Sequence, residues 1–379
     1  MAVLARPRPS SSPSPGDPSA ADPRRRPHQC RFAAVATAGL LAATLAACGN
    51  DTPLGGGGPK TESLPPQAAL KASLDGLGNS SALDLTFRLG VSAEDLKAIS
   101  TKGEGDPLTD AQAKLITGGD VQIVSRTTDG SKVTEAKPGA TAFSLAVHTD
   151  GGSIVELRST DGKVLFVRAD VKKIAEISGT PASDVDRGLA DVPPQLSFLK
   201  DGAAGKWLSL DLMAAQGLAK QFGGSAVPTP DPAAAKAAGN ELIAALQRDV
   251  VATRGEASDK GDHLILTGST RTLAKDFVEN VSKAVPGGAA GLGSFKPEDV
   301  EDKPFTLDAY VKDGRLSLLS MDISQFAEGK DKADFDGKPF PVEIAFGTEA
   351  PSIEAPADAV PVDLQKVVQA FLGGLSSGG

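Results

Sequence analysis

Four Asp-Gly pairs, each standing between two stretches that alternate apolar and polar residues, constrain the fold of this chain more than any other feature. They lie at 129–130, 150–151, 161–162 and 313–314. Glycine supplies the positive φ that tight hairpins need, and aspartate favours the same turns. Because hairpins join neighbouring antiparallel strands, this spacing predicts a meandering antiparallel sheet and not a parallel sheet with helical crossovers.

Alternation of apolar and polar residues marks the strands themselves. In residues 82–91, apolar side chains alternate with polar residues or glycine, as expected for a strand with one buried face. Comparable patterns predict strands within eight further segments, the seventh of which holds two strands joined by its Asp-Gly pair. These segments are 120–130, 140–152, 153–162, 163–170, 205–212, 262–269, 304–324 and 338–347.

Helical spacing of apolar residues predicts the other elements. The segments are 67–79, 92–100, 109–117, 170–179, 181–193 (helix or loop), 213–224, 232–251, 271–285 and 363–375, of which 232–251 is the longest. The order is helix, strands, helices, strands, helix, which predicts an α+β fold. Two halves, 64–225 and 232–375, share this loose order without a repeat at the level of residues.

The N-terminal segment has the three regions of a signal peptide. Four arginines at 24, 25, 26 and 31 precede a 14-residue apolar stretch, 32–45, which is short for a membrane span. The stretch ends in Leu45, Ala46, Ala47 and Cys48. One interpretation of this segment is an ordinary secretory signal peptide in which Cys48 occurs by chance. The chain also carries Arg24-Arg25, so export by a twin-arginine route is an alternative to the general secretory route.

Composition excludes several function classes. The 379-residue chain has a net charge of −9, and loss of residues 1–47, which hold six arginines and two aspartates, would make it −13. Such an acidic protein does not suit nucleic acid or an anionic bilayer surface as partner. The two cysteines are Cys30 and Cys48, so a chain that begins at Cys48 forms no internal disulfide and no cysteine metal site.

No pattern of catalytic residues stands out. The sequence lacks a nucleophile elbow, a Walker loop and a dinucleotide fingerprint, so we predict no catalytic residue and no cofactor. His148 and His263 have no second histidine or cysteine at metal-ligand spacing and are interpreted as structural or solvated. Three aspartates in a lysine-rich loop hint at calcium but lack the bidentate glutamate of an EF-hand, so no metal is predicted; they are Asp331, Asp334 and Asp336.

The end of the apolar stretch resembles the lipobox of bacterial lipoproteins. The resemblance implies that Leu45, Ala46 and Ala47 are recognised by signal peptidase II and that Cys48 is lipidated on sulfur. It divides the chain into an extension and signal peptide (1–47), a Gly-rich tether (48–63) and a folded domain (64–375). Two acyl chains would anchor the protein stably to the outer face of the cytoplasmic membrane, and the alanine- and glycine-rich composition suggests a high-GC bacterium.

The folded part resembles actinobacterial lipoproteins of the LolA/LprG/LppX-like family. The segments that carry the resemblance are 82–89, 155–173, 205–212 and 305–324. The family implies a strongly curved antiparallel sheet, a half-barrel, covered by helices and able to bind lipids. We therefore expect a monomeric, non-enzymatic carrier of a lipid or other hydrophobic ligand, with ligand residues unassigned. The alternative is a structural, sensor or adaptor lipoprotein with a closed core.

Overall fold

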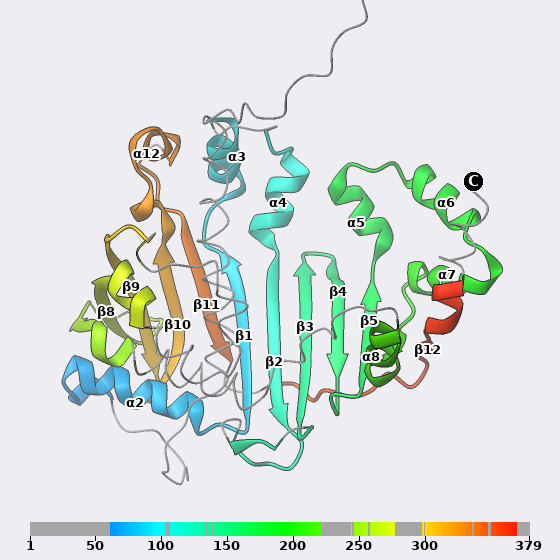
Figure 1. The fold of residues 1–379 in the computed structure, drawn as a ribbon. Coiled ribbons are helices and arrows are strands. Elements are labelled where there is room, and N and C mark those ends of the chain that lie inside the picture. The colour runs from blue at the N-terminus through cyan, green and yellow to red at the C-terminus, as the bar shows by residue number, and fades with distance from the viewer. Residues whose placement is uncertain are drawn as a thin grey trace, which may run out of the picture. The chain divides into compact units, whose positions relative to one another are not determined.

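The computed structural model describes residues 61–102, 107–132, 135–137, 139–221, 244, 246–256, 258–276, 298, 300–335, 337–347 and 350–369. All of them belong to one compact unit, Ala42–Gly379. In Figure 1 the strands of this unit stand side by side in one sheet, with α2 at their lower ends and α3, α4, α5 and α12 at their upper ends.

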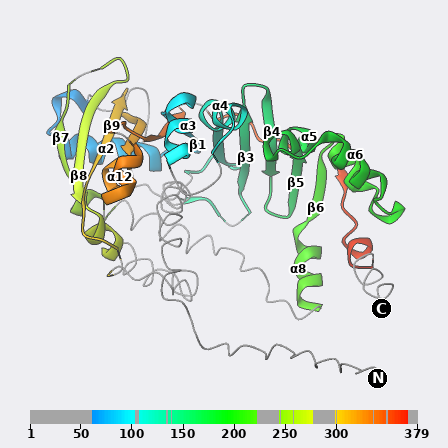
Figure 2. The same ribbon diagram turned by 90° about the horizontal axis from the view of Figure 1, so that it is seen from above.

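The sheet has twelve strands in the order β12-β6-β5-β4-β3-β2-β1-β11-β10-β9-β8-β7. Among the described residues the two edge strands, β12 and β7, do not pair with each other, so the sheet is open; Figure 2 shows β6 and β7 on opposite sides. The strands are β1 (Ala82–Leu89), β2 (Asp120–Thr127), β3 (Thr141–Thr149), β4 (Gly152–Ser159), β5 (Val164–Ala169), β6 (Leu208–Asp211), β7 (Val251–Arg254), β8 (Asp262–Ser269), β9 (Pro304–Lys312), β10 (Arg315–Asp322), β11 (Pro341–Gly347) and β12 (Val360–Pro361).

The two halves that the sequence suggests share this one sheet. Strand β1 pairs with β11 across more than 250 residues of sequence, with Leu85 opposite Phe346. Every pairing is antiparallel except that of β12 with β6, which is parallel. The predicted α+β class with a mostly antiparallel open sheet is therefore confirmed, and the one parallel pair is a two-residue addition at the edge.

Short helices connect or flank the strands. They are α2 (Pro66–Gly78), α3 (Ala93–Lys102), α4 (Asp110–Gly118), α5 (Val171–Ser178), α6 (Ala182–Ala190), α7 (Phe198–Ala203), α8 (Leu212–Gln221) and α12 (Gly329–Phe335), with 3-10 turns at Thr61–Ser63, Pro194–Leu196 and Ile323–Phe326. Helix α5 begins where the Asp170 side chain accepts the Lys173 N–H, and ends where Gly179 takes a φ of 72°.

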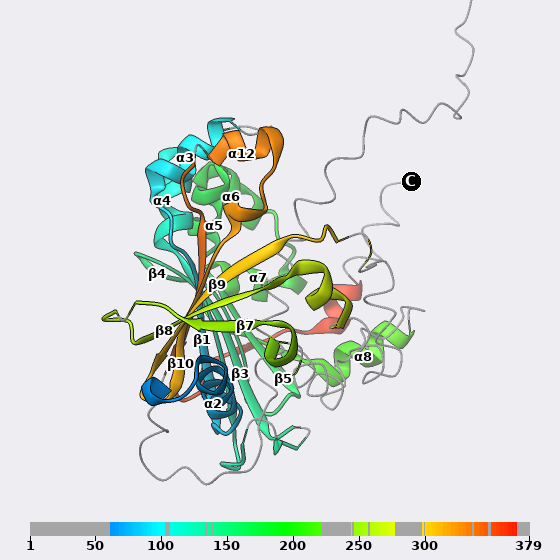
Figure 3. The ribbon, with the colours of Figure 1, turned by 90° about the vertical axis from the view of Figure 1, so that its left-hand side faces the viewer.

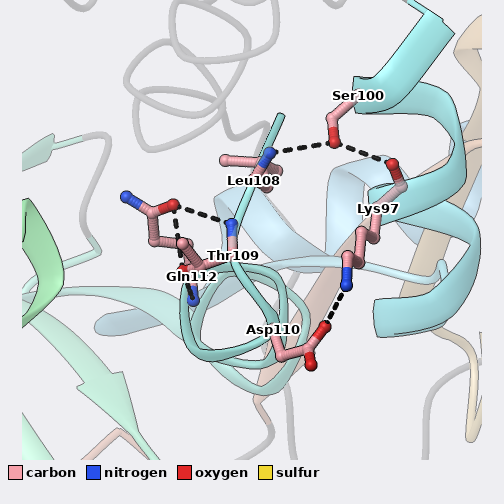
Figure 4. Close-up of polar contacts among 6 residues, drawn as sticks. All are labelled: Lys97, Ser100, Leu108, Thr109, Asp110 and Gln112. Atoms are coloured by element: carbon pink, nitrogen blue, oxygen red, sulfur yellow. Dashed lines mark hydrogen bonds and ion pairs between the residues drawn. The ribbon is translucent and has the colours of Figure 1, made fainter. Parts of the chain in front are cut away.

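The junction of α3 and α4 shows how local sequence sets a helix start. Thr109 and Gln112 form a reciprocal capping box at α4, and Ser100 Oγ accepts the Leu108 N–H at 3.1 Å (Figure 4). Lys97 forms an ion pair with Asp110 across the junction. Beneath it lies a small core of Val91, Leu96, Ala113 and Phe340, which joins both helices to the start of β11.

The main core lies at the β7–β10 end of the sheet, where α2 packs against β10 and β7 (Figure 3). Helix α2 buries Leu70, Leu74 and Leu77 there. Its Gln67 amide also covers the edge strand, because Nε2 donates to Val250 O at 3.1 Å and Oε1 accepts the Ala252 N–H at 3.0 Å. A side chain thus takes the hydrogen bonds that another strand would make.

The fold begins slightly before the predicted position of residue 64. Thr61 is buried, and the Arg254 guanidinium donates to the carbonyls of Thr61 and Leu64 at 3.3 and 2.8 Å. Arg254 also pairs with Asp262 of β8. This contact fixes the entry of the chain to the β7–β8 edge, so residues 61–63 of the predicted tether belong to the fold.

One Asp-Gly turn matches its prediction in detail, and two differ from it. At 313–314 both residues have positive φ, 53° and 72°, as a two-residue hairpin requires. At 150–151 the positive φ falls on Gly152, whose φ is 106°, and not on Gly151. The pair 129–130 lies in a long β2–β3 connection instead of a tight turn. All three still join antiparallel neighbours.

Several short elements differ from the sequence expectation. The predicted helix 232–251 ends on Val251, the first residue of β7. This strand was not predicted, because an edge strand of four residues is too short to show alternation. Helix α7 was not predicted. Helix α12 lies where the sequence suggested a loop, in the segment that holds Asp331 and Asp334. Most of 232–251, of 271–285 and the end of 363–375 lie outside the described residues.

Candidate functional site

The register of the sheet defines two faces. We call the side of Leu85 the apolar face and the side of Thr86 the polar face. One lateral row of cross-strand neighbours on the apolar face crosses the strands from β8 to β5 and consists of Leu264, Ala309, Leu319, Ile344, Phe87, Val121, Val147, Val155 and Ala169. A second row consists of Phe346, Leu85, Ile123, Leu145, Leu157, Val167 and Leu208.

Burial divides both rows at β1. In the first row the members from β8 to β11 are buried, with Leu264 and Ala309 at 0% exposure. From Phe87 onward every member of that row is half-buried, as is every member of the second row beyond Leu85. We call these ten residues the half-buried patch; they are Phe87, Val121, Ile123, Leu145, Val147, Val155, Leu157, Val167, Ala169 and Leu208.

On the same strands the buried apolar residues lie on the polar face. Val124, Ala142 and Ala146 are 2–7% exposed, although their side of the sheet is otherwise polar. The segment after β11 covers part of this face on its way to β12: Arg126 donates to Ala350 O at 3.1 Å, and residues 351–353 line one cleft with side chains of β2–β4. The usual arrangement, with the apolar side more deeply buried, is therefore reversed across β2–β5.

A charged cluster lies within the polar face. Glu156 is 6% exposed and binds two guanidinium groups, Arg158 at 2.9 Å and Arg168. Both guanidinium groups stack on Trp207, the only tryptophan, at 4.7 and 5.0 Å from the ring centroid. Burial would raise the pKa of Glu156, but hydrogen bonds from Arg168 and Ser153 and the two positive charges outweigh it and hold that pKa below its ordinary value.

Replacing Glu156 by glutamine is expected to lower the free energy of unfolding at pH 7 by about 2 kcal/mol, less than for a fully buried pair because both arginines keep contact with water. Since the folded-state pKa lies below the ordinary 4.5, the contribution is present above pH 4.5 and is lost as the pH falls through the folded-state value. The measurement is urea unfolding of both proteins from pH 3 to pH 8.

The matched control is Glu176→Gln, which removes an exposed carboxylate paired with Lys173 at 3.0 Å on α5. We expect a loss of about 0.3 kcal/mol there. A Glu156→Gln effect that is as small as the control, or that stays constant down to pH 3, contradicts the assignment of Glu156 as an ionised, paired group.

Both histidines that the sequence singles out lie on the polar face in single carboxylate pairs. His148 Nδ1 is 2.8 Å from Asp120 Oδ1, and His263 Nε2 is 2.8 Å from Asp308 Oδ1 with the ring stacked on Tyr310. Neither pair is part of a larger group, since the described residues contain no set of three side chains able to hold a metal ion. The structural interpretation of His148 and His263 fits these contacts.

The predicted lipidation and recognition residues, Leu45, Ala46, Ala47 and Cys48, lie outside the described residues. Among the helices that are described, none has the length and apolar character that crossing a bilayer demands. The cluster around Glu156 was not predicted. Its signal in the sequence was the lone Trp207 together with charged residues at alternating positions, Glu156 and Arg158 on one strand and Arg168 on the next.

Together these features define an α+β protein with one large open, mostly antiparallel sheet, half-buried on its apolar side. No protein-family model matches the chain, and no curated protein matches it. Solved structures that are similar in fold include two mycobacterial proteins. Lipoprotein LppX of Mycobacterium tuberculosis is 10% identical to this chain, with a TM-score of 0.28. The match covers 76% of this chain and 97% of the LppX chain. LprF of Mycobacterium bovis is 10% identical to this chain, with a TM-score of 0.33. The match covers 80% of this chain and 100% of the LprF chain.

Proposed function

We propose that this protein is a membrane-tethered, extracytoplasmic lipoprotein that binds a lipid or another hydrophobic ligand on the half-buried patch and is not an enzyme. The observation that carries the proposal is the division of the apolar face at β1. Ten aliphatic or aromatic side chains in two continuous rows keep contact with solvent, while the first row is buried on β8–β11 and the second is buried at Phe346 and Leu85. Smooth aliphatic walls of this kind suit acyl chains.

The lipobox resemblance supplies the location in this proposal. Lipidated Cys48 holds the protein at the outer face of the membrane, and residues 49–60 connect it to Thr61, where the fold begins. Twelve residues of glycine-rich chain span about 20 Å on average and about 40 Å when extended. The domain therefore stays near the bilayer, from which a hydrophobic ligand could be taken or to which it could be delivered.

The test is binding of a dansyl-labelled fatty acid to the purified full chain, together with native mass spectrometry of the protein after gentle extraction. The variant Leu145→Gln places an amide in the centre of the half-buried patch and is expected to weaken binding about tenfold or more. Ser144→Gln, the neighbour on the opposite face, is the control and should bind as the original does.

Three outcomes are decisive. Saturable binding that is lost in Leu145→Gln and kept in Ser144→Gln supports the proposal. Binding that is equal in all three proteins places the ligand elsewhere and contradicts the assigned surface. Repeated recovery without lipid, and no saturable binding of the probe, contradicts the carrier function and leaves the structural or adaptor alternative.

A further inference from the structure

A cleft on the polar face lies next to the Glu156 cluster. It measures about 480 Å³ and is bounded by β4, β5, the start of α5 and the end of α7, with Ser153, Arg168, Asp170 and Lys172 among its lining residues. A smaller cleft of about 220 Å³ adjoins it, shares Ser153 and is lined by His148, Glu156 and Arg158. Side chains of one charged network therefore line two neighbouring concavities.

The arginines of these clefts are held in fixed positions. Each guanidinium carries five N–H donors, and Glu156 accepts one hydrogen bond from Arg158 and one from Arg168. The indole of Trp207 supports both groups from one side. Because the side chains are already ordered, a ligand that binds them loses little further side-chain entropy.

The charge balance around the larger cleft favours an anion. Its charged lining residues are Arg168, Lys172 and one carboxylate, Asp170, which leaves one positive charge in excess on a protein whose net charge is −9. Asp170 is engaged at the start of α5, where it accepts the Lys173 N–H at 2.9 Å. Lys172 is 67% exposed and reaches Asp186 only at 3.9 Å, so its ammonium can move toward the cleft.

We infer that this cleft binds an anionic oxygen group, a phosphate ester or a carboxylate, through Arg168 and Lys172, with Ser153 beside them. Planar guanidinium groups match such oxygens with paired hydrogen bonds, and a lysine adds a mobile point charge. Arg168 lies on the opposite face of the sheet from the half-buried patch, although Ala169, a member of that patch, also borders the cleft. The test with small anions does not use the proposed hydrophobic ligand, so it remains valid if that proposal fails.

The experiment is calorimetric titration of the purified full chain with inorganic phosphate, glycerol 3-phosphate and succinate. Saturable binding of at least one anion is expected, weakened by added salt. Tighter binding of glycerol 3-phosphate than of phosphate indicates a headgroup or sugar phosphate as the source, equal binding indicates the free ion, and preference for succinate indicates a carboxylate.

Variants assign the binding to the cleft. Arg168→Gln is expected to weaken it about tenfold and Lys172→Gln about threefold, since the lysine is more exposed. Lys71→Gln on α2 removes the same charge far from the cleft and should leave binding unchanged. If Arg168→Gln does not fold, Arg168→Lys, which keeps the charge and loses the paired geometry, replaces it.

Two results would overturn the inference. One is the absence of saturable binding for all three anions at tens of millimolar in low salt. The other is an equal loss in Lys71→Gln and in the cleft variants, which would show a general effect of net charge and no site.

Discussion

Replacing Cys48 by alanine is expected to abolish acylation of the protein. The sulfur of Cys48 is the proposed acceptor of the diacylglyceryl group, and signal peptidase II would not cleave a chain that lacks it. The variant would then carry no acyl chain and would be released unprocessed or as soluble protein, so the loss of labelled lipid is close to all-or-none. The measurements are incorporation of labelled palmitate, the mass of the N-terminal peptide and fractionation of membranes.

Cys30→Ala serves as the control, because it removes the other cysteine of the chain from within the predicted signal segment. That variant should be processed and lipidated as the original is. If Cys48→Ala still yields a mature acylated protein, the lipobox interpretation is wrong, and the ordinary secretory signal with a chance cysteine replaces it. The folded domain should be unaffected in either variant, because both cysteines precede Thr61, the first residue that the structure describes.

Replacing Leu264 by alanine is expected to lower the free energy of unfolding by about 3–4 kcal/mol. The side chain is fully buried on β8, opposite Ala309 of β9, in the closed part of the apolar face. Truncating such a leucine loses its transfer free energy and leaves a cavity that neighbouring strands fill incompletely. Urea unfolding at pH 7 gives the value directly.

Leu157→Ala is the matched variant on the half-buried patch. The same truncation should cost about 1 kcal/mol there, because part of the leucine already contacts water. Binding of the dansyl fatty acid should show the opposite order, with a loss in Leu157→Ala and little change in Leu264→Ala. Equal stability losses for the two variants would show that the patch is closed core and would argue against a ligand surface.

Local pattern predicted most of the sheet. The alternation in β1, β3, β4 and β9 appears in the structure with the expected face toward the apolar side, because a strand side chain changes face at every residue whatever its neighbours are. Prediction failed for β7 and α12. Neither is longer than two periods of its own pattern, and β7 is held by Gln67, a residue more than 180 positions away.

The candidate sites divide in the same way. The proposed lipidation site at Cys48 depends only on residues adjacent in sequence, so the sequence alone suggests it. The cluster of Glu156, Arg158 and Arg168 on Trp207 required the register of β4 with β5 and the placement of the residue before β6, which arise when strands pair.

The sequence by itself determined most of the strands, their antiparallel hairpins and the side of these strands that is apolar, because these depend on periods of two residues and on turn chemistry. The tertiary structure alone decided that the two halves join at β1 and β11, that the apolar rows close on β8–β11 and stay half-buried from β2 to β6, and that buried residues lie on the polar face. The physical reason is that burial depends on which distant segments pack on a face. The periodic pattern of one strand does not specify those segments.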